Sequence, residues 1–112
     1  MVTTEYIPDR GDLIWLEFTP RSGHEQAGIR PGLVISPFPY NQVSGLCVVF
    51  PVTSKIKGYP FEVKVTTLLV SGVVLADQVK TLDWKTRNAR FICKADTNVV
   101  EDVINLFSTL LT

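Results

Sequence analysis

The stretch that decides the fold lies at residues 46–52 and reads Leu46-Cys47-Val48-Val49-Phe50-Pro51-Val52. β-Branched and aromatic side chains, which are enriched in strands, make up most of it. A run that is apolar at successive positions, rather than at alternate ones, is typical of a strand covered on both faces. We therefore expect residues 46–52 to form a central β-strand.

Shorter strand patterns lie on both sides of this run. They occupy residues 12–18, 33–35, 61–65, 73–76, 79–84 and 90–93. Two intervening segments differ from them, since residues 37–45 are typical of a turn and residues 53–60 are polar. About seven short strands separated by turns predict a mainly β fold, a closed or nearly closed barrel.

The last part of the chain has a helical period. Apolar side chains recur there at intervals of three and four residues, at Val99, Val100, Val103, Ile104, Phe107, Leu110 and Leu111. Asp96 or Thr97 can cap the start of such a helix. We expect a C-terminal α-helix whose wide apolar face covers the barrel mouth or a partner.

Length and composition indicate a globular protein. The chain has 112 residues, of which 46% are hydrophobic and 20% are charged. This length is near the commonest domain size, so we expect residues 1–112 to form a single domain. No apolar run reaches the roughly 20 residues of a membrane helix, and residues 1–6 lack the basic and apolar regions of a secretory signal. The expected location is the cytoplasm, without contact with a membrane.

Cysteine and histidine are scarce. Cys47 and Cys93 each lie in an apolar run, where a buried free thiol is the expected state. With His24 as the single histidine, a closed zinc site is excluded. The sequence also lacks a P-loop, a dinucleotide fingerprint and a nucleophile elbow.

The charge distribution leaves two interpretations open. The net charge is zero, which argues against nucleic-acid binding, yet residues 80–94 hold five cations against one acid, Asp83. This stretch fits a polyanion on one face of the molecule. Equally, it fits an ordinary solvated strand edge protected by lysine and arginine.

Candidate chemistry gathers in a polar loop at residues 19–29. It contains His24, Glu25 and Gln26, and Arg30 follows it directly. The ordinary pKa of histidine, near 6.5, suits proton transfer at neutral pH, although an ordinary loop histidine fits equally well. Arg30 precedes Pro31, which favours an extended backbone; it could stabilise an anion or simply pair with Glu25.

Polar side chains also interrupt the strand pattern at two other places. Thr53 and Ser54 follow the central run and should emerge at the barrel rim, where hydroxyls often bond only locally. Asp77 and Gln78 separate two strand patterns and form either a turn or part of a site. Tyr59 lies in a polar loop where its ring could stack on an unpaired base.

Over nearly its whole length the chain resembles the MazF/PemK (Kid) toxins of bacterial toxin-antitoxin modules. The matching segments are Arg10-Gly11-Asp12-Leu13-Ile14-Trp15, Gly23-His24-Glu25-Gln26-Ala27-Gly28 with Arg30-Pro31, Pro51-Val52-Thr53-Ser54, Lys57-Gly58-Tyr59-Pro60-Phe61-Glu62-Val63 and Gly72-Val73-Val74-Leu75-Ala76-Asp77-Gln78-Val79-Lys80-Thr81-Leu82. Several of these residues are polar and follow no packing period.

The resemblance implies an SH3-like barrel with a C-terminal α-helix, the MazF/PemK/CcdB-like fold, assembled as a homodimer. It also implies a sequence-specific endoribonuclease toxin that cleaves single-stranded RNA, chiefly mRNA, and that uses neither a metal nor a cofactor. Its products would be a 2',3'-cyclic phosphate and a 5'-hydroxyl. A cognate, MazE-like antitoxin would neutralise it.

The resemblance further implies roles for individual residues. Arg30 would stabilise charge on the phosphate, Thr53 would be the catalytic hydroxyl, and Glu25 or His24 would act as the base, with Glu25 alternatively orienting Arg30. The implied RNA contacts are Gln26, Ser54, Lys55, Lys57, Asp77, Gln78 and Lys80.

Two alternatives stay open. One is a non-catalytic, CcdB-like inhibitor of DNA gyrase, although that family ends on a tryptophan-isoleucine pattern and this chain ends Leu110-Leu111-Thr112. The other is an RNA-binding member of the resembling family that no longer cleaves. It would require broken site residues, and Arg30 and Thr53 are intact.

Overall fold

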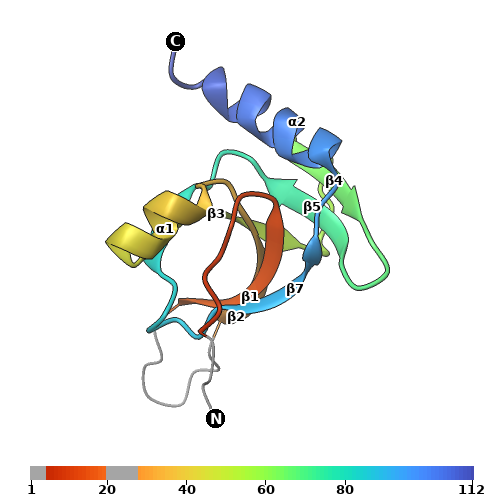
Figure 1. Cartoon of the computed structure of the whole chain (residues 1–112). Coiled ribbons are helices and arrows are strands. Elements are labelled where there is room, and N and C mark those ends of the chain that lie inside the picture. The colour runs from red at the N-terminus through yellow and green to blue at the C-terminus, as the bar shows by residue number, and fades with distance from the viewer. Residues whose placement is uncertain (1–4, 20–27) are drawn as a thin grey trace.

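The computed structural model describes residues 5–19 and 28–112, which form seven strands and two helices (Figure 1). The strands are β1 (Asp12–Thr19), β2 (Gly28–Val34), β3 (Leu46–Thr53), β4 (Glu62–Thr66), β5 (Ser71–Leu75), β6 (Lys80–Asp83) and β7 (Arg90–Lys94). The helices are α1 (Phe38–Ser44) and α2 (Thr97–Ser108).

Strand β3 is the centre of the sheet, as the sequence predicts. It pairs with β2 along one edge, and along the other edge with β6 over Leu46–Val49 and with β5 at Val52 and Thr53. The strand order is β4-β5-β3-β2-β1-β7, with β6 as a branch on β3, and all of these pairs are antiparallel. In the described part of the chain, β4 and β7 do not pair, so the barrel is not closed by hydrogen bonds.

Both faces of the central strands are buried, which explains the uninterrupted apolar run. One face contributes Leu33, Phe50 and Val52 to a core cluster beneath α2. The other contributes Val34, Cys47 and Val49 to a second cluster around Trp84. Because strand side chains alternate between faces, neighbours in sequence enter different cores. The mainly β fold with a C-terminal helix is thus confirmed.

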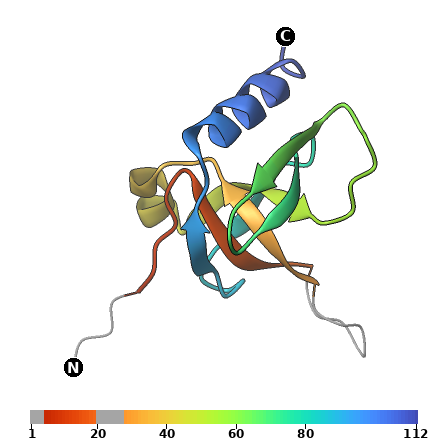
Figure 2. The same cartoon turned by 90° about the vertical axis from the view of Figure 1, so that its right-hand side faces the viewer.

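Helix α2 covers the first core cluster from one end of the sheet, as Figures 1 and 2 show. Val100 and Val103 are buried, and the ring of Phe107 meets that of Phe50 edge-on, with centroids 5.4 Å apart. Asp96 occupies one of the two predicted cap positions, but its side chain makes no capping hydrogen bond. The helix ends at Ser108, so Leu110 and Leu111 lie beyond it and are largely exposed.

One predicted turn and the predicted start of one strand are wrong. Residues 38–44 form α1 instead of a turn, because Asn41 is fully buried and anchors this segment. Its side-chain amide donates to the carbonyl oxygens of Pro8 and Ser36 at 2.8 and 3.0 Å, and the indole N–H of Trp84 donates to its carbonyl oxygen at 2.9 Å. Strand β2 begins at Gly28, not at residue 33, because pairing with β1 extends it.

Cys47 and Cys93 carry free thiols, the first buried and the second half-buried. Burial, with a smaller effect of Asp83, raises the pKa of Cys47 to about 12, so this thiol stays neutral. Within residues 5–19 and 28–112, no group of three or more His, Cys, Asp or Glu side chains is placed to hold a metal ion. No helix in these ranges is long and apolar enough to cross a membrane.

Candidate active site

A cavity of about 590 Å³ opens where the end of β3 meets β2, the β3–β4 loop and the β5–β6 turn. Its lining residues are Arg30, Thr53, Lys55, Lys57, Gly58, Tyr59, Pro60, Glu62, Leu75, Asp77 and Gln78. Figure 2 shows the β3–β4 loop as the long yellow-green segment that extends away from the strands. Three separate segments of the chain, at residue 30, residues 53–62 and residues 75–78, therefore contribute to one site.

Arg30 and Thr53 approach this cavity from neighbouring antiparallel strands. Gly32 of β2 pairs with Pro51 of β3, and continuing this register by two residues along each strand places Arg30 level with Thr53. Arg30 is exposed and Thr53 is half-buried at the strand end. The strand that contains Pro31 is extended, as predicted. The sheet register thus brings a fixed cation and a hydroxyl to the same rim.

Gly72 of β5 fixes the position of Thr53 from the other side. A Cβ atom at residue 72 would lie 2.2 Å from the carbonyl oxygen of Thr53, far inside van der Waals contact, so only glycine allows β5 to pass here. The hydroxyl oxygen of Thr53 accepts a hydrogen bond of 3.1 Å from the backbone N–H of Lys55. A hydroxyl that accepts in this way can still donate its own hydrogen to a ligand.

The turn between β5 and β6 contributes Asp77 and Gln78. The backbone N–H of Gln78 donates to the carbonyl oxygen of Leu75 at 3.1 Å, which confirms the turn, while both polar residues also border the cavity. The hydroxyl of Tyr59 donates to Oδ2 of Asp77 at 2.8 Å. This bond to a carboxylate raises the pKa of the Tyr59 phenol above its ordinary value, so Tyr59 stays a neutral donor.

The lining of the cavity carries more positive than negative charge. Arg30, Lys55 and Lys57 supply three positive charges against the two carboxylates of Glu62 and Asp77, so the lining carries a net charge of +1. Asp77 accepts from Tyr59, and Glu62 accepts from backbone amides of the β3–β4 loop. A concave surface with an excess of positive charge attracts a polyanion such as a phosphodiester chain.

The structure brings together Arg30, Thr53, Lys55, Lys57, Asp77 and Gln78 of the residues that the sequence proposed. Ser54 is exposed next to Thr53 but does not line the cavity. Lys80 does not line it either: it pairs with Val49, four residues before Thr53, a separation of about 13 Å along a strand. His24, Glu25 and Gln26 lie outside the described residues.

The basic stretch at residues 80–94 is largely occupied with structural contacts. Lys94 lies 2.6 Å from Oδ1 of the buried Asp12, and Lys85 lies 3.1 Å from Oε2 of Glu5. Arg87 donates to the carbonyl oxygens of Glu17 and Phe18. These contacts favour the interpretation of this stretch as a strand edge over that of a polyanion-binding face.

Three residues of the site were not singled out as site residues from the sequence: Tyr59, Glu62 and Gly72. Tyr59 entered only as a ring that could stack on a base, yet its hydroxyl contacts Asp77. Glu62 was interpreted as an ordinary polar position of an alternating strand, and Gly72 lay just before the strand predicted at residues 73–76. A carboxylate two residues after a Gly-Tyr-Pro turn and a glycine directly before an apolar strand pattern are the signals that could have identified the last two.

Comparison with known proteins gives consistent matches. A sequence model of the family described as PemK-like, MazF-like toxin of type II toxin-antitoxin system matches residues 9–111. The chain is 51% identical over 88 residues to the endoribonuclease toxin MazF of Escherichia coli K12, which covers 79% of each chain. It is 33% identical over 109 residues to the endoribonuclease PemK of Escherichia coli, covering 93% of this chain and 82% of the relative.

Among solved structures, the MazE-MazF complex (Form-II) of Deinococcus radiodurans contains a similar chain. The TM-score is 0.90 and the sequence identity is 52%, with coverage of 96% of this chain and 97% of the other.

Proposed function

This chain belongs to the PemK-like, MazF-like toxins of type II toxin-antitoxin systems, and from that membership we propose that it is a sequence-specific endoribonuclease that cleaves single-stranded RNA, chiefly mRNA. The observation that carries the proposal is the meeting of Arg30 and Thr53 at one cavity with Lys55 and Lys57. This set provides what RNA cleavage without a metal requires: positive charge for a phosphate and a hydroxyl beside it.

In the proposed reaction, the ribose 2'-oxygen attacks the adjacent phosphorus and the bond to the 5'-oxygen breaks. A base removes the proton of the 2'-hydroxyl, and the leaving 5'-oxygen takes up a proton, so the products are a 2',3'-cyclic phosphate and a 5'-hydroxyl. Arg30 stabilises the negative charge that develops on the phosphate oxygens, and the hydroxyl of Thr53 donates to one of them. We propose Glu25 or His24 as the base.

The remaining cavity residues serve RNA binding in this proposal. Lys55 and Lys57 hold backbone phosphates, while the ring of Tyr59 and the polar groups of Asp77 and Gln78 contact unpaired bases. Gln26, Ser54 and Lys80 were also proposed as RNA contacts. Ser54 adjoins the cavity, whereas Lys80 could contact only RNA that extends beyond it along the β3 edge.

We also propose a MazE-like antitoxin as the partner. It is supported by the solved complex in which a chain 52% identical to this one is described together with MazE. Antitoxin and RNA would exclude one another if both use the electropositive cavity. The further expectations of a homodimer, of one domain over residues 1–112 and of a cytoplasmic location remain part of the proposal.

The DNA gyrase alternative is not favoured. The family match extends over residues 9–111, and the curated relatives at 51% and 33% identity are named endoribonucleases. Intact RNA, together with inhibition of the supercoiling activity of DNA gyrase, would support this alternative instead.

The experiment that tests the proposal is incubation of the purified protein with a long single-stranded RNA in excess EDTA. Primer extension maps the cut sites, and labelling with polynucleotide kinase identifies 5'-hydroxyl ends. We expect discrete cuts with 5'-hydroxyl ends that are lost in Arg30→Ala but kept in Arg90→Ala, a matched control because Arg90 is exposed and does not line the cavity. Intact RNA with the wild-type protein would contradict the proposal.

A further inference from the structure

Glu62, the first residue of β4, holds the β3–β4 loop with both oxygens of its carboxylate. Oε2 accepts the backbone N–H of Lys57 and Oε1 that of Gly58, each at 3.0 Å. The backbone N–H of Glu62 in turn donates to the carbonyl oxygen of Tyr59 at 3.0 Å. Hydrogen bonds to an ionised carboxylate are stronger than those between neutral groups. The three bonds therefore hold residues 57–59 firmly against Glu62.

The backbone at Gly58 makes this arrangement possible. Its φ of +76° lies in the left-handed region, which glycine adopts without a steric penalty. A left-handed residue next to a right-handed or extended one turns successive N–H groups toward the same side, and such a concavity binds anions. Here the anion is the carboxylate of Glu62 from the same chain.

The residues held in place by the hydrogen bonds to Glu62 are cavity residues. Lys57 and Tyr59 flank Gly58, and both line the cavity with Arg30 and Thr53. Tyr59 is fixed at its far end by the hydrogen bond to Asp77. Two side-chain anchors, Glu62 and Asp77, therefore hold the loop relative to Arg30 and Thr53, in addition to the backbone hydrogen bond from Ala76 to Phe61 at the end of the loop.

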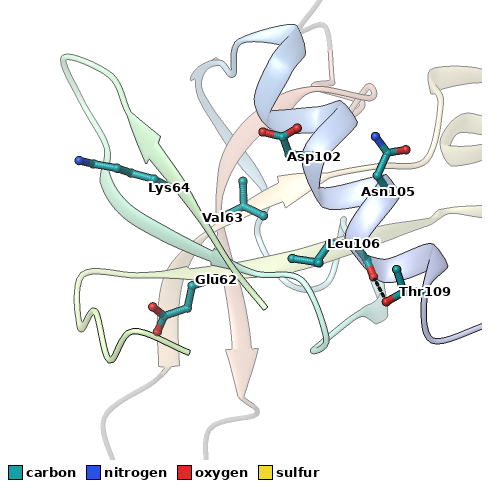
Figure 3. A pocket seen from close by; sticks show the side chains of 7 residues that line it. All are labelled: Glu62, Val63, Lys64, Asp102, Asn105, Leu106 and Thr109. Carbon is teal, nitrogen blue, oxygen red and sulfur yellow. Dashed lines mark hydrogen bonds between the residues drawn. The ribbon is translucent and has the colours of Figure 1, made fainter. Parts of the chain in front are cut away.

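The Glu62 carboxylate does not pack against α2. A second cavity, of about 500 Å³, lies between these elements, and Glu62 borders it together with Val63 and Leu106. Figure 3 shows Val63 and Leu106 pointing into the space between β4 and α2, whereas the carboxylate of Glu62 turns away from α2. Its two oxygens are directed to the loop instead.

We propose that Glu62 is a positioning residue for RNA binding, which holds the β3–β4 loop so that Lys57 and Tyr59 meet the substrate. This inference rests on the proposed endoribonuclease function. In this proposal the carboxylate acts on the substrate through the loop, because each of its oxygens accepts a backbone amide of that loop. Its loss should weaken substrate binding and leave the chemical step at Arg30 and Thr53 nearly intact.

Glu62→Gln tests this role, because glutamine keeps the size of the side chain but replaces one acceptor oxygen with a donor. Hydrogen exchange of the Lys57 and Gly58 amides should accelerate, with the core strands unchanged. On an oligonucleotide that contains a mapped cut site, KM should rise about tenfold, the factor that one lost charge-assisted hydrogen bond corresponds to, while kcat changes by less than about threefold. Glu101→Gln, which removes the same charge from an exposed position of α2, should behave like the wild type.

Gly58→Ala is a second variant that disturbs the same turn without altering β4. The added Cβ meets no atom within 4 Å, so only the strain of the left-handed backbone acts. It should raise KM in the same way. An unchanged KM in Glu62→Gln beside normal wild-type cleavage would overturn the positioning role alone, as would a fall in kcat as large as in Arg30→Ala. A wild-type protein that cuts no RNA would overturn the proposed function instead.

Discussion

The hydroxyl of Tyr59 donates a hydrogen bond of 2.8 Å to Oδ2 of Asp77, and so joins the β3–β4 loop to the β5–β6 turn across the candidate active site. The same two segments are joined at their base by a backbone hydrogen bond of 2.8 Å from the N–H of Ala76 to the carbonyl oxygen of Phe61. The side-chain bond adds a second link between two walls of the cavity. Their relative position should therefore respond to the loss of either partner.

The titration of Tyr59 reports on this link. Asp77 raises the pKa of the phenol above its ordinary value, because the hydrogen bond and the negative charge favour the protonated form. In Asp77→Asn the pKa of Tyr59 should fall back toward that value, as followed by ultraviolet absorbance of tyrosinate. A folded-state pKa that is raised contributes stability below the unfolded pKa, which is lost as the pH rises through the folded one. A phenol that titrates identically in Asp77→Asn would contradict the contact.

Gly72→Ala should disturb the site through the backbone. The added Cβ would lie 2.2 Å from the carbonyl oxygen of Thr53, so β5 or the end of β3 must move. We expect a loss of about 1–3 kcal/mol in the free energy of unfolding, typical of overpacking, measured by urea denaturation. RNA cleavage should fall as well. Ser71→Ala, at the exposed neighbouring position, is the control, and equal behaviour of the two variants would be evidence against the close approach.

Thr53→Val isolates the hydroxyl, since valine keeps the branched shape of the side chain at the end of β3. We expect the single-turnover cleavage rate to fall on the order of a hundredfold, as for the removal of one donor to a developing oxyanion. Thr53→Ser, which keeps the hydroxyl, should retain most of the rate. A full rate in Thr53→Val would remove Thr53 from the proposed mechanism.

Lys94→Met distinguishes structural from RNA-binding cations. The ammonium group of Lys94 lies 2.6 Å from Oδ1 of Asp12, whose side chain is only 4% exposed. Without its partner this carboxylate is a buried charge with less compensation, although the hydroxyl of Tyr6 and the N–H of Asp9 still donate to its other oxygen. We expect the free energy of unfolding to fall by about 1–3 kcal/mol. RNA affinity of the folded variant should not change; a large loss of affinity would assign Lys94 to the RNA surface.

The strands were predictable because their signals are local. The apolar run at residues 46–52 indicates a strand buried on both faces, and β3 indeed lies between two core clusters. The period of the apolar residues likewise places α2. Helix α1 was missed because its stability comes from distant residues: Asn41 is held by Pro8 and Trp84, which no local pattern connects to it.

The candidate site was only partly predictable. Arg30 and Thr53 were candidates from their places in the sequence, but their catalytic roles came from family resemblance. Their proximity depends on the register of β2 and β3, which composition does not determine. The role of the basic stretch at residues 80–94 could not be predicted for the same reason. The partners of Lys85 and Lys94 are the acids Glu5 and Asp12, some 80 residues earlier in the chain. Glu62 and Gly58 are close in sequence, but their contact depends on a left-handed backbone that the sequence only permits.

The central claim is that the ribose 2'-oxygen attacks the phosphate held at Arg30 and Thr53. The most direct test is an RNA oligonucleotide with a mapped cut site in which the nucleotide on the 5' side of the cut carries a single 2'-deoxy substitution. The wild-type protein should cut the all-ribose strand and leave the substituted bond intact, while binding both strands with similar affinity. Cleavage of the deoxy-substituted bond at a comparable rate would contradict the mechanism.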